Sequence, residues 1–511
     1  SGCAKNVSIS VKKNDANTLK VGVPGSLSTL DINQEAGILN YYVSAIVQEG
    51  LVGIDDTGKF IPALATEWTD EDSTVWTFTV REDVKFSDGS IMTADDIIYS
   101  INHAMDPELS PGTSIYFPDY VTKVEKANDG GKEKVVITLD GPHPGFIWAV
   151  TNSGGLFVTS EKFAEKAGSI GSKKDLILGT GPYKAESFEP GSQATFAVNK
   201  EYWGDNDSSY DKIKFDFIED SNTRLQAFTG GDIDFTWDMP VTQEEQYKKA
   251  SGATVRYTDN RSYYGITFNT AEGPFTDEHL RKAVSYAIDK DGIVNGIYKG
   301  HAEIATAIPA PTQFASEMDK DEAIKLLGTV THYDFDLAKA KEELAQSGYK
   351  DGLKTTITYP DAYQEVGKAS LAIAASLKEL GIELEVKEIP LEQWLTEIGS
   401  GDLGWMIYVP TTGEPGEITT WLLDAQGQDY NPANWTNEEV AHLTADSNIQ
   451  KDVKNQIDDI IISSNIAGQQ AIYAPTFWGT TGMAFSGKIA PSEFGPYTML
   501  SAQWPSKVSA K

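Results

Sequence analysis

Two hydrophobic periodicities, that of a strand and that of a helix, divide the first half of the chain into short predicted elements. Residues 18–25 form an apolar run that stops at Pro24-Gly25, and residues 75–81 alternate so that one face is aromatic and aliphatic, which is typical of strands. Residues 38–47 repeat with helical spacing, and Thr93 with Asp96 forms a capping box that starts another helix. Further strands are predicted over residues 134–139, 194–198, 212–218 and 233–237.

The order of elements is clearest after residue 350. The pattern predicts a strand over 353–359, a helix over 364–380, a strand over 382–389, a short helix around Trp394 and a strand over 405–409. Strands that alternate with helices of these lengths indicate right-handed crossovers and a parallel sheet. The fold class is therefore predicted to be α/β.

Composition narrows the classes of partner. The 511 residues, enough for two or three domains, contain 42 Lys+Arg and 75 Asp+Glu, so the net charge is −33. Such an acidic chain is poorly suited to nucleic acid or to an anionic membrane surface. Because Cys3 is the only cysteine, no disulfide can form within the chain. No apolar run reaches the length of a membrane span.

The N-terminus reads as a flexible tether over residues 1–17, because it is polar and has no periodicity. Ser1-Gly2-Cys3 is similar to the end of a bacterial lipoprotein signal, after which Cys3 would become the lipidated first residue. The alternative is an isolated cysteine in a tail. A lipid at Cys3 would hold the rest of the chain just outside a membrane, as its only membrane contact.

Signatures of catalysis are weak. Residues 53–60 nearly match a phosphate loop but end in Phe60, which lacks the hydroxyl that binds magnesium, so Asp55–Gly58 is better interpreted as a hairpin turn. Residues 482–489 fail in the same way. The six histidines are scattered without a metal-ligand spacing. We therefore expect no enzyme activity, no metal and no cofactor.

Aromatic residues at strand ends and in loops are more informative. They are either core residues or the walls of a ligand cleft, where Tyr and Trp offer contact area at a low entropic cost. This group comprises Tyr116, Tyr263, Tyr264, Trp394, Trp405 and Tyr408.

Several ordered segments together resemble the family 5 extracellular solute-binding proteins, the peptide receptors of bacterial ABC importers. They are residues 60–68, 76–81, 86–96, 179–183, 199–203 and 281–290. The resemblance spans about residues 18–505 and implies a periplasmic-binding-protein-like fold, with mixed sheets flanked by helices in three lobes around one ligand cleft. Lobe I would comprise 18–44, 180–260 and 485–511, lobe II 45–179, and lobe III 261–484.

The same resemblance implies ligand-binding positions. In peptide receptors of the family, a segment of the form Gly-Trp-x-x-Asp lines the cleft, and its aspartate pairs with the ligand's amino group. Here Trp405 matches, but Tyr408 stands in the aspartate's place. Either Glu414 or Glu417 supplies the carboxylate, or the ligand has no free amine, which would suit an oligosaccharide. An oligosaccharide would stack on Trp394, Trp405 and Tyr408. The family also implies cleft positions for Tyr116, Tyr263, Tyr264 and Tyr363.

The function implied is that of a monomeric, lipid-anchored receptor in the periplasm or on the cell surface. It would capture peptides by closure of its lobes and deliver them to the permease subunits of an ABC importer. The alternative is an oligosaccharide receptor of the same family.

Overall fold

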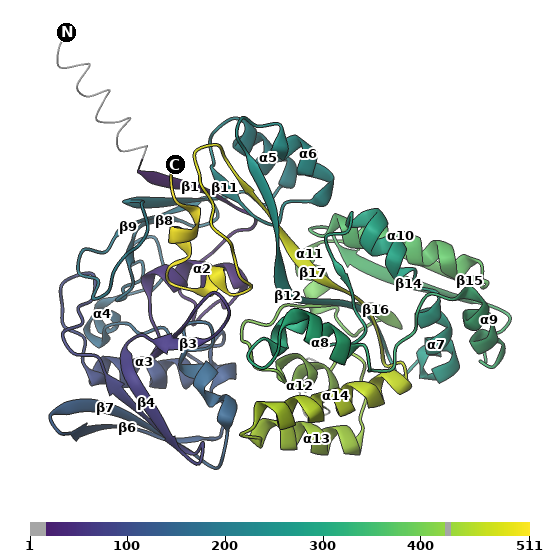
Figure 1. Cartoon of the computed structure of the whole chain (residues 1–511), viewed down its shortest axis with the longest axis horizontal. Helices are drawn as coiled ribbons and strands as arrows, with labels where there is room; N and C mark the ends of the chain where they lie inside the picture. Colours follow the sequence, from purple (N-terminus) through teal and green to yellow (C-terminus); the bar gives the residue numbers. More distant parts are fainter. Residues whose placement is uncertain (1–16, 425–430) are drawn as a thin grey trace, which may run out of the picture. The chain divides into compact units, whose positions relative to one another are not determined.

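Two long strands divide the chain into two units. The computed structural model describes residues 17–424 and 431–511. Unit 1 comprises Ser1–Thr258 and Thr481–Lys511, and unit 2 comprises Asp259–Thr480. The chain enters unit 2 within β12 (Thr254–Phe268) and leaves it within β17 (Tyr473–Phe485). In Figure 1 β12 is teal and β17 is yellow.

Unit 1 contains a mixed sheet. Its strands are β1 (Thr18–Val23), β8 (Tyr183–Glu189), β9 (Gln193–Val198), β10 (Lys212–Phe217) and β11 (Phe235–Thr236). Strand β1 is parallel to both β10 and β11, whereas β10, β9 and β8 follow one another antiparallel. The end of β17 pairs antiparallel with β11, with Phe485 opposite Phe235. The helices of this region are α2 (Ile38–Val47), α5 (Ser221–Thr229) and α6 (Glu244–Lys248).

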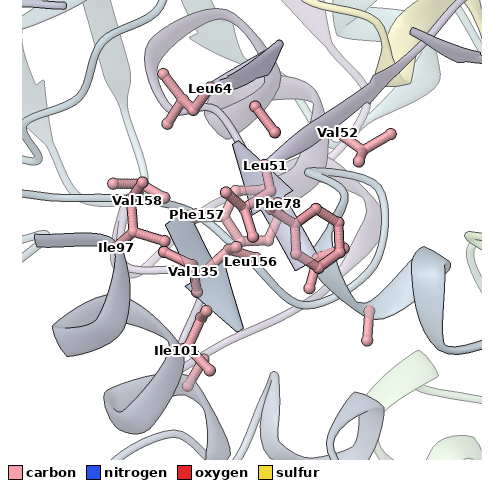
Figure 2. Packing of buried hydrophobic residues seen from close by; sticks show 14 of the residues in the cluster. Leu51, Val52, Leu64, Phe78, Ile97, Ile101, Val135, Leu156, Phe157 and Val158 are labelled. Atoms are coloured by element: carbon pink, nitrogen blue, oxygen red, sulfur yellow. The ribbon is translucent and has the colours of Figure 1, made fainter. Parts of the chain in front are cut away.

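The rest of unit 1 is built on an antiparallel sheet. Its order in the described residues is β4 (Ala65–Glu71), β5 (Val75–Val80), β7 (Lys132–Leu139) and β6 (Val121–Asp129). Around it lie the hairpin β2 (Val52–Ile54) and β3 (Phe60–Pro62) and the helices α3 (Ala94–Met105) and α4 (Glu161–Lys166). Alternate residues of β5 and β7, such as Phe78 and Val135, face inward and meet Ile97 and Ile101 of α3 (Figure 2).

Unit 2 contains an antiparallel ladder in which β16 (Leu403–Tyr408) pairs with β12. The short strand β13 (Glu303–Ile304) pairs with β17. Strands β14 (Leu353–Pro360) and β15 (Ile382–Ile389) form a separate parallel pair, and α10 (Gln364–Lys378) packs on it (Figure 1). The other helices of unit 2 are α7 (Glu278–Tyr286), α8 (Lys320–Leu327), α9 (Leu337–Ala345), α11 (Leu391–Thr396), α12 (Glu417–Leu423), α13 (Glu438–Ile449) and α14 (Val453–Gln469).

Local predictions from the sequence are confirmed. The helix at 38–47 and the strand at 382–389 have the predicted bounds. The capping box exists, since the backbone N–H of Thr93 donates to Asp96 Oδ2 at 2.9 Å. The hairpin turn at Asp55–Gly58 is confirmed by the hydrogen bond from the Asp55 N–H to the Lys59 oxygen at 2.9 Å and by the left-handed φ of +89° at Gly58.

One prediction of sheet topology is wrong. The sequence places residues 405–409 as a third strand of the parallel sheet, but β16 is the ladder partner of β12 and runs antiparallel to it. Hydrophobic periodicity shows that a segment is a strand, but the choice of partner depends on residues about 140 positions away in sequence. Apart from Asn17, the predicted tether and the lipidation predicted at Cys3 lie outside the described residues. The boundaries of the three lobes stay a prediction.

Candidate functional site

A pocket of about 170 Å³ lies in unit 2, beside the edge strand β16. One wall is β14, where Thr356 and Thr358 line the pocket, and another is the connection from α11 to β16. Strands β14 and β16 border the same pocket but are not paired as a ladder in the described residues. The pocket therefore lies between β14 and the edge of β16 that has no ladder partner in the described residues.

Glycines shape the entrance of this pocket. Gly399 has a φ of +81°, a conformation that side chains rarely adopt, and it turns the chain from α11 toward β16. Gly404 lies within β16, and a Cβ atom there would meet no heavy atom within 4 Å. Open space thus continues from the pocket to the backbone of β16, where a ligand's main chain can approach closely.

The two predicted tryptophans form walls of the pocket and also belong to the core of unit 2. Trp394 is 5% exposed and Trp405 is 2% exposed. The indole N–H of Trp405 donates to Ser370 Oγ on α10 at 2.8 Å, which fixes the ring. Both residues therefore have the core role that the sequence offered as one alternative, and their predicted role in ligand binding stays a prediction.

The tyrosines of β12 lie beside β16. Tyr263 is opposite Tyr408 and Tyr264 is opposite Ile407 in the antiparallel register. The Tyr263 side chain is fully buried, and Tyr264 stacks on Phe477 with ring centroids 4.4 Å apart. Both rings stabilise the sheet on which β16 is held.

Tyr408 and Glu417 are joined directly. The Tyr408 hydroxyl donates to Glu417 Oε2 at 3.1 Å. Thr412 donates to Glu417 Oε1 through its backbone N–H at 3.3 Å and also through its hydroxyl. Burial raises the pKa of Glu417, while these donors and the charge of Arg261 act in the opposite direction. The carboxylate therefore holds the loop between β16 and α12.

Glu414 lies in the same loop and has a different partner. Its side chain accepts a hydrogen bond from Gln456 of α14, and its backbone oxygen accepts one from Gln313 at 2.9 Å. Burial raises the pKa of Glu414 to about 7. Arg261, which the sequence analysis did not select, donates through Nε to the Pro410 oxygen at 2.7 Å and closes this cluster.

The two remaining predicted residues lie elsewhere. Tyr363 is the residue before α10 and packs against the core of unit 2. Tyr116 ends a short 3₁₀ helix in unit 1 and packs against that unit's core. The structure thus brings together Trp394 with Trp405, and Tyr408 with Glu417. The roles predicted for all nine residues stay predictions.

Sequence reasoning missed the polar lining of the pocket. Besides the two threonines of β14, it includes Thr267 near the end of β12, Asn269 directly after β12 and Glu397 directly after α11. A signal existed for β14, where Thr356 and Thr358 alternate with Ile357. In residues 17–424 and 431–511, no group of three or more His, Cys, Asp or Glu side chains could hold a metal ion. The same residues contain no helix with the length and apolarity needed to cross a bilayer.

Comparison with known proteins identifies the family. Residues 59–430 match the family described as "Bacterial extracellular solute-binding proteins, family 5 Middle". The periplasmic murein peptide-binding protein MppA of Escherichia coli K12 is 25% identical over 484 residues, which cover 89% of this chain and 86% of that protein.

Solved structures share the fold. DppA from Helicobacter pylori, an ABC transporter-associated periplasmic binding protein in complex with the peptide STSA, has a TM-score of 0.79 at 22% identity and covers 98% of this chain and 100% of that one. AgaA of A. tumefaciens R10, in complex with agropinic acid, has a TM-score of 0.78 at 20% identity and covers 97% and 99%. The α/β, periplasmic-binding-protein-like fold expected from the sequence is confirmed. The chain belongs to the bacterial extracellular solute-binding proteins of family 5, which bind solutes and are not enzymes.

Proposed function

We propose that this protein is the peptide receptor of an ABC importer and that β16 with its pocket is part of the peptide-binding site. The observation that supports this most is the edge of β16. In the described residues β16 has β12 as its ladder partner on one edge and no ladder partner on the other. Its second edge borders the pocket through Gly404 and Trp405.

An edge of this kind suits a peptide of variable sequence. The backbone N–H and C=O groups on the outer side of an edge strand can pair with an added extended segment. Such pairing uses only main-chain groups of the ligand, which every peptide has. Side chains of the ligand then enter pockets beside the strand, where Trp394 and Trp405 offer rigid walls.

The comparisons support a peptide rather than another solute. MppA is a murein peptide-binding protein and covers most of this chain, and the DppA structure holds a peptide. We extend this ligand class to the present protein. Uptake by ABC permease subunits, closure of the lobes, a monomeric state and a lipid anchor at Cys3 complete the proposal of a periplasmic or cell-surface receptor.

Gly404 provides the test. A Cβ at this position meets nothing within 4 Å, so Gly404→Ala leaves the unliganded fold unstrained but fills the space that a ligand backbone would occupy. Gly296→Ala is a matched control in unit 2, because its Cβ also meets nothing within 4 Å and Gly296 is not among the residues that line the pocket. Isothermal titration with a set of tri- and tetrapeptides is the assay.

We expect Gly404→Ala to weaken peptide binding by about ten-fold or more, equivalent to about 1.4 kcal/mol, with an unchanged melting temperature in the absence of ligand. Gly296→Ala should bind like the wild type. Equal affinity of Gly404→Ala and wild type would exclude β16 from the site. Failure of every peptide to bind the wild type would refute the peptide function itself.

A second candidate ligand is an oligosaccharide or another solute without a free amine. Two observations favour it: Tyr408 occupies the position of the amine-pairing aspartate, and the pocket is lined with hydroxyls from Thr267, Thr356, Thr358 and Ser400. The AgaA structure contains agropinic acid. A thermal-shift screen of both ligand classes distinguishes them, since a ligand that binds the folded state raises its melting temperature.

A further inference from the structure

We propose that the pocket in unit 2 selects its ligand by charge, with Glu397 as the counter-ion of a cationic group. This inference rests on the proposed function and adds specificity to the same site. The group is an ammonium or guanidinium, carried either by a basic side chain or by the amino terminus of the peptide. A carboxylate is disfavoured there.

The charge of the pocket supports this inference. Among the described residues that line it, Glu397 is the one with an ionisable acidic or basic side chain. The sequence contains no Lys or Arg between Lys387 and Lys451, a stretch that includes α11, β16 and the loop after β16. A ligand carboxylate in the pocket would therefore find a nearby negative charge and no cation from this stretch to pair with.

Glu397 is also free to accept a new donor. It is exposed at the end of α11, and its Oε1 accepts a hydrogen bond from Gln393 Nε2 at 3.0 Å. Its Oε2 accepts none from the described residues. A cation can therefore bind at Oε2 without displacing an existing interaction.

The two acids predicted from the sequence are less suited to this role. Glu417 already accepts hydrogen bonds from Tyr408 and Thr412, and the charge of Arg261 acts on it. Glu414 accepts a hydrogen bond from Gln456. Neither residue lines the pocket. Both hold the loop after β16 and lie outside the pocket lining, so Glu397 is the acid that a cation in the pocket meets.

The walls of the pocket fit a long cationic side chain. Trp394 and Trp405 can cover the methylene stem of a lysine, and the face of an indole attracts a nearby cation. The hydroxyls of Thr356 and Thr358 offer oxygen acceptors for the remaining N–H groups. An aliphatic side chain of the same length would use the walls but leave these acceptors without donors.

The experiment compares three peptides that differ only in the middle residue: Ala-Lys-Ala, Ala-Met-Ala and Ala-Glu-Ala, each with a free and with an acetylated amino terminus. Their dissociation constants are measured by titration calorimetry for the wild type, Glu397→Gln and Glu392→Gln. Glu392 is the matched control, because it is an exposed acid of α11 that does not line the pocket.

For the wild type we expect the lysine peptide to bind about ten-fold tighter than the glutamate peptide, with a smaller ratio at high salt. Glu397→Gln should reduce this ratio to near one, and Glu392→Gln should leave it unchanged. If the amino terminus is the cation instead, Glu397→Gln weakens all free peptides equally and leaves the acetylated ones unaffected, which also supports the proposal.

The inference is overturned if Glu397→Gln retains both the wild-type lysine-to-glutamate ratio and the wild-type affinity for free peptides. That result would leave the peptide function intact, since the peptides still bind. Absence of binding by all six peptides would instead refute the peptide function, and the charge selection with it.

Discussion

Glu49 provides a quantitative test of how unit 1 is stabilised. This glutamate is 4% exposed, and its Oε1 accepts hydrogen bonds from Thr180 Oγ1 at 2.8 Å and from Trp203 Nε1 at 2.7 Å. Arg81 lies over the Trp203 ring at 3.8 Å and adds a positive charge nearby. Burial outweighs these contacts and raises the pKa of Glu49 from 4.5 to about 7.

The raised pKa fixes the sign of the effect. Because the folded state holds the proton more tightly than the unfolded state, Glu49 costs stability as the pH rises from about 4.5, and the cost is complete above about pH 7. At 1.36 kcal/mol per pKa unit, the cost is about 3 kcal/mol at pH 8 and about 0.8 kcal/mol at pH 5. Glu49→Gln resembles the protonated acid and keeps an oxygen for both donors, so it should recover most of this difference.

Urea unfolding at pH 5 and pH 8, followed by tryptophan fluorescence, measures the effect. We expect Glu49→Gln to be more stable than the wild type by roughly 1–3 kcal/mol at pH 8 and by less than about 1 kcal/mol at pH 5. Glu82→Gln, at an exposed acid of the same unit, should show no such pH-dependent gain. An equal effect of Glu49→Gln at the two pH values, or a loss of stability at pH 8, would refute the reasoning.

Three further predictions concern packing and charge. Gly179→Ala should destabilise the protein by about 1–3 kcal/mol, because its Cβ would lie 2.1 Å from a backbone oxygen at the end of α2. The Cβ of Gly141→Ala meets nothing within 4 Å, so this variant should be neutral in thermal melts. Trp405→Phe should lower the free energy of unfolding in urea by about 1 kcal/mol or more, because the hydrogen bond to Ser370 is lost. Trp405→Ala should lower it by about 3–5 kcal/mol, so peptide affinity is best measured on the Phe variant. The pKa of Asp459 is raised to about 7 by burial and by hydrogen bonding to a neighbouring acid. Asp459→Asn should therefore raise the melting temperature at pH 8 but not at pH 4. Equal shifts at both pH values would contradict the last of these.

Local structure was predictable because its causes are local. The helix at 38–47, the capping box at Thr93 and the turn at Asp55–Gly58 each depend on residues within a few positions of one another. Strands β14 and β15 and their crossover helix α10 were predicted for the same reason, since a parallel pair joined by one helix has few topological alternatives.

Long-range contacts were not predictable from patterns. The pairing of β16 with β12 brings Tyr408 opposite Tyr263. The hydrophobic pattern of either segment does not indicate which other strand it pairs with. The sequence indicated Trp394 and Trp405 as candidates but could not show that they are buried walls of a pocket. Glu397 had no signal at all, because one acid among 75 becomes distinctive only when a pocket places it.

The exchange of aspartate for tyrosine at position 408 has a structural counterpart. A carboxylate still lies beside this position, but it belongs to Glu417 at the start of α12. It accepts a hydrogen bond from the Tyr408 hydroxyl at 3.1 Å. There it serves the loop after β16, because Thr412 also donates to it. A ligand amine at this point would meet a phenol instead of a free acid, so attraction for a cation must come from another part of the site. Among the described residues that line the pocket, the carboxylate is that of Glu397, and charge selection is therefore expected to depend on a residue outside the family's ligand-binding segment.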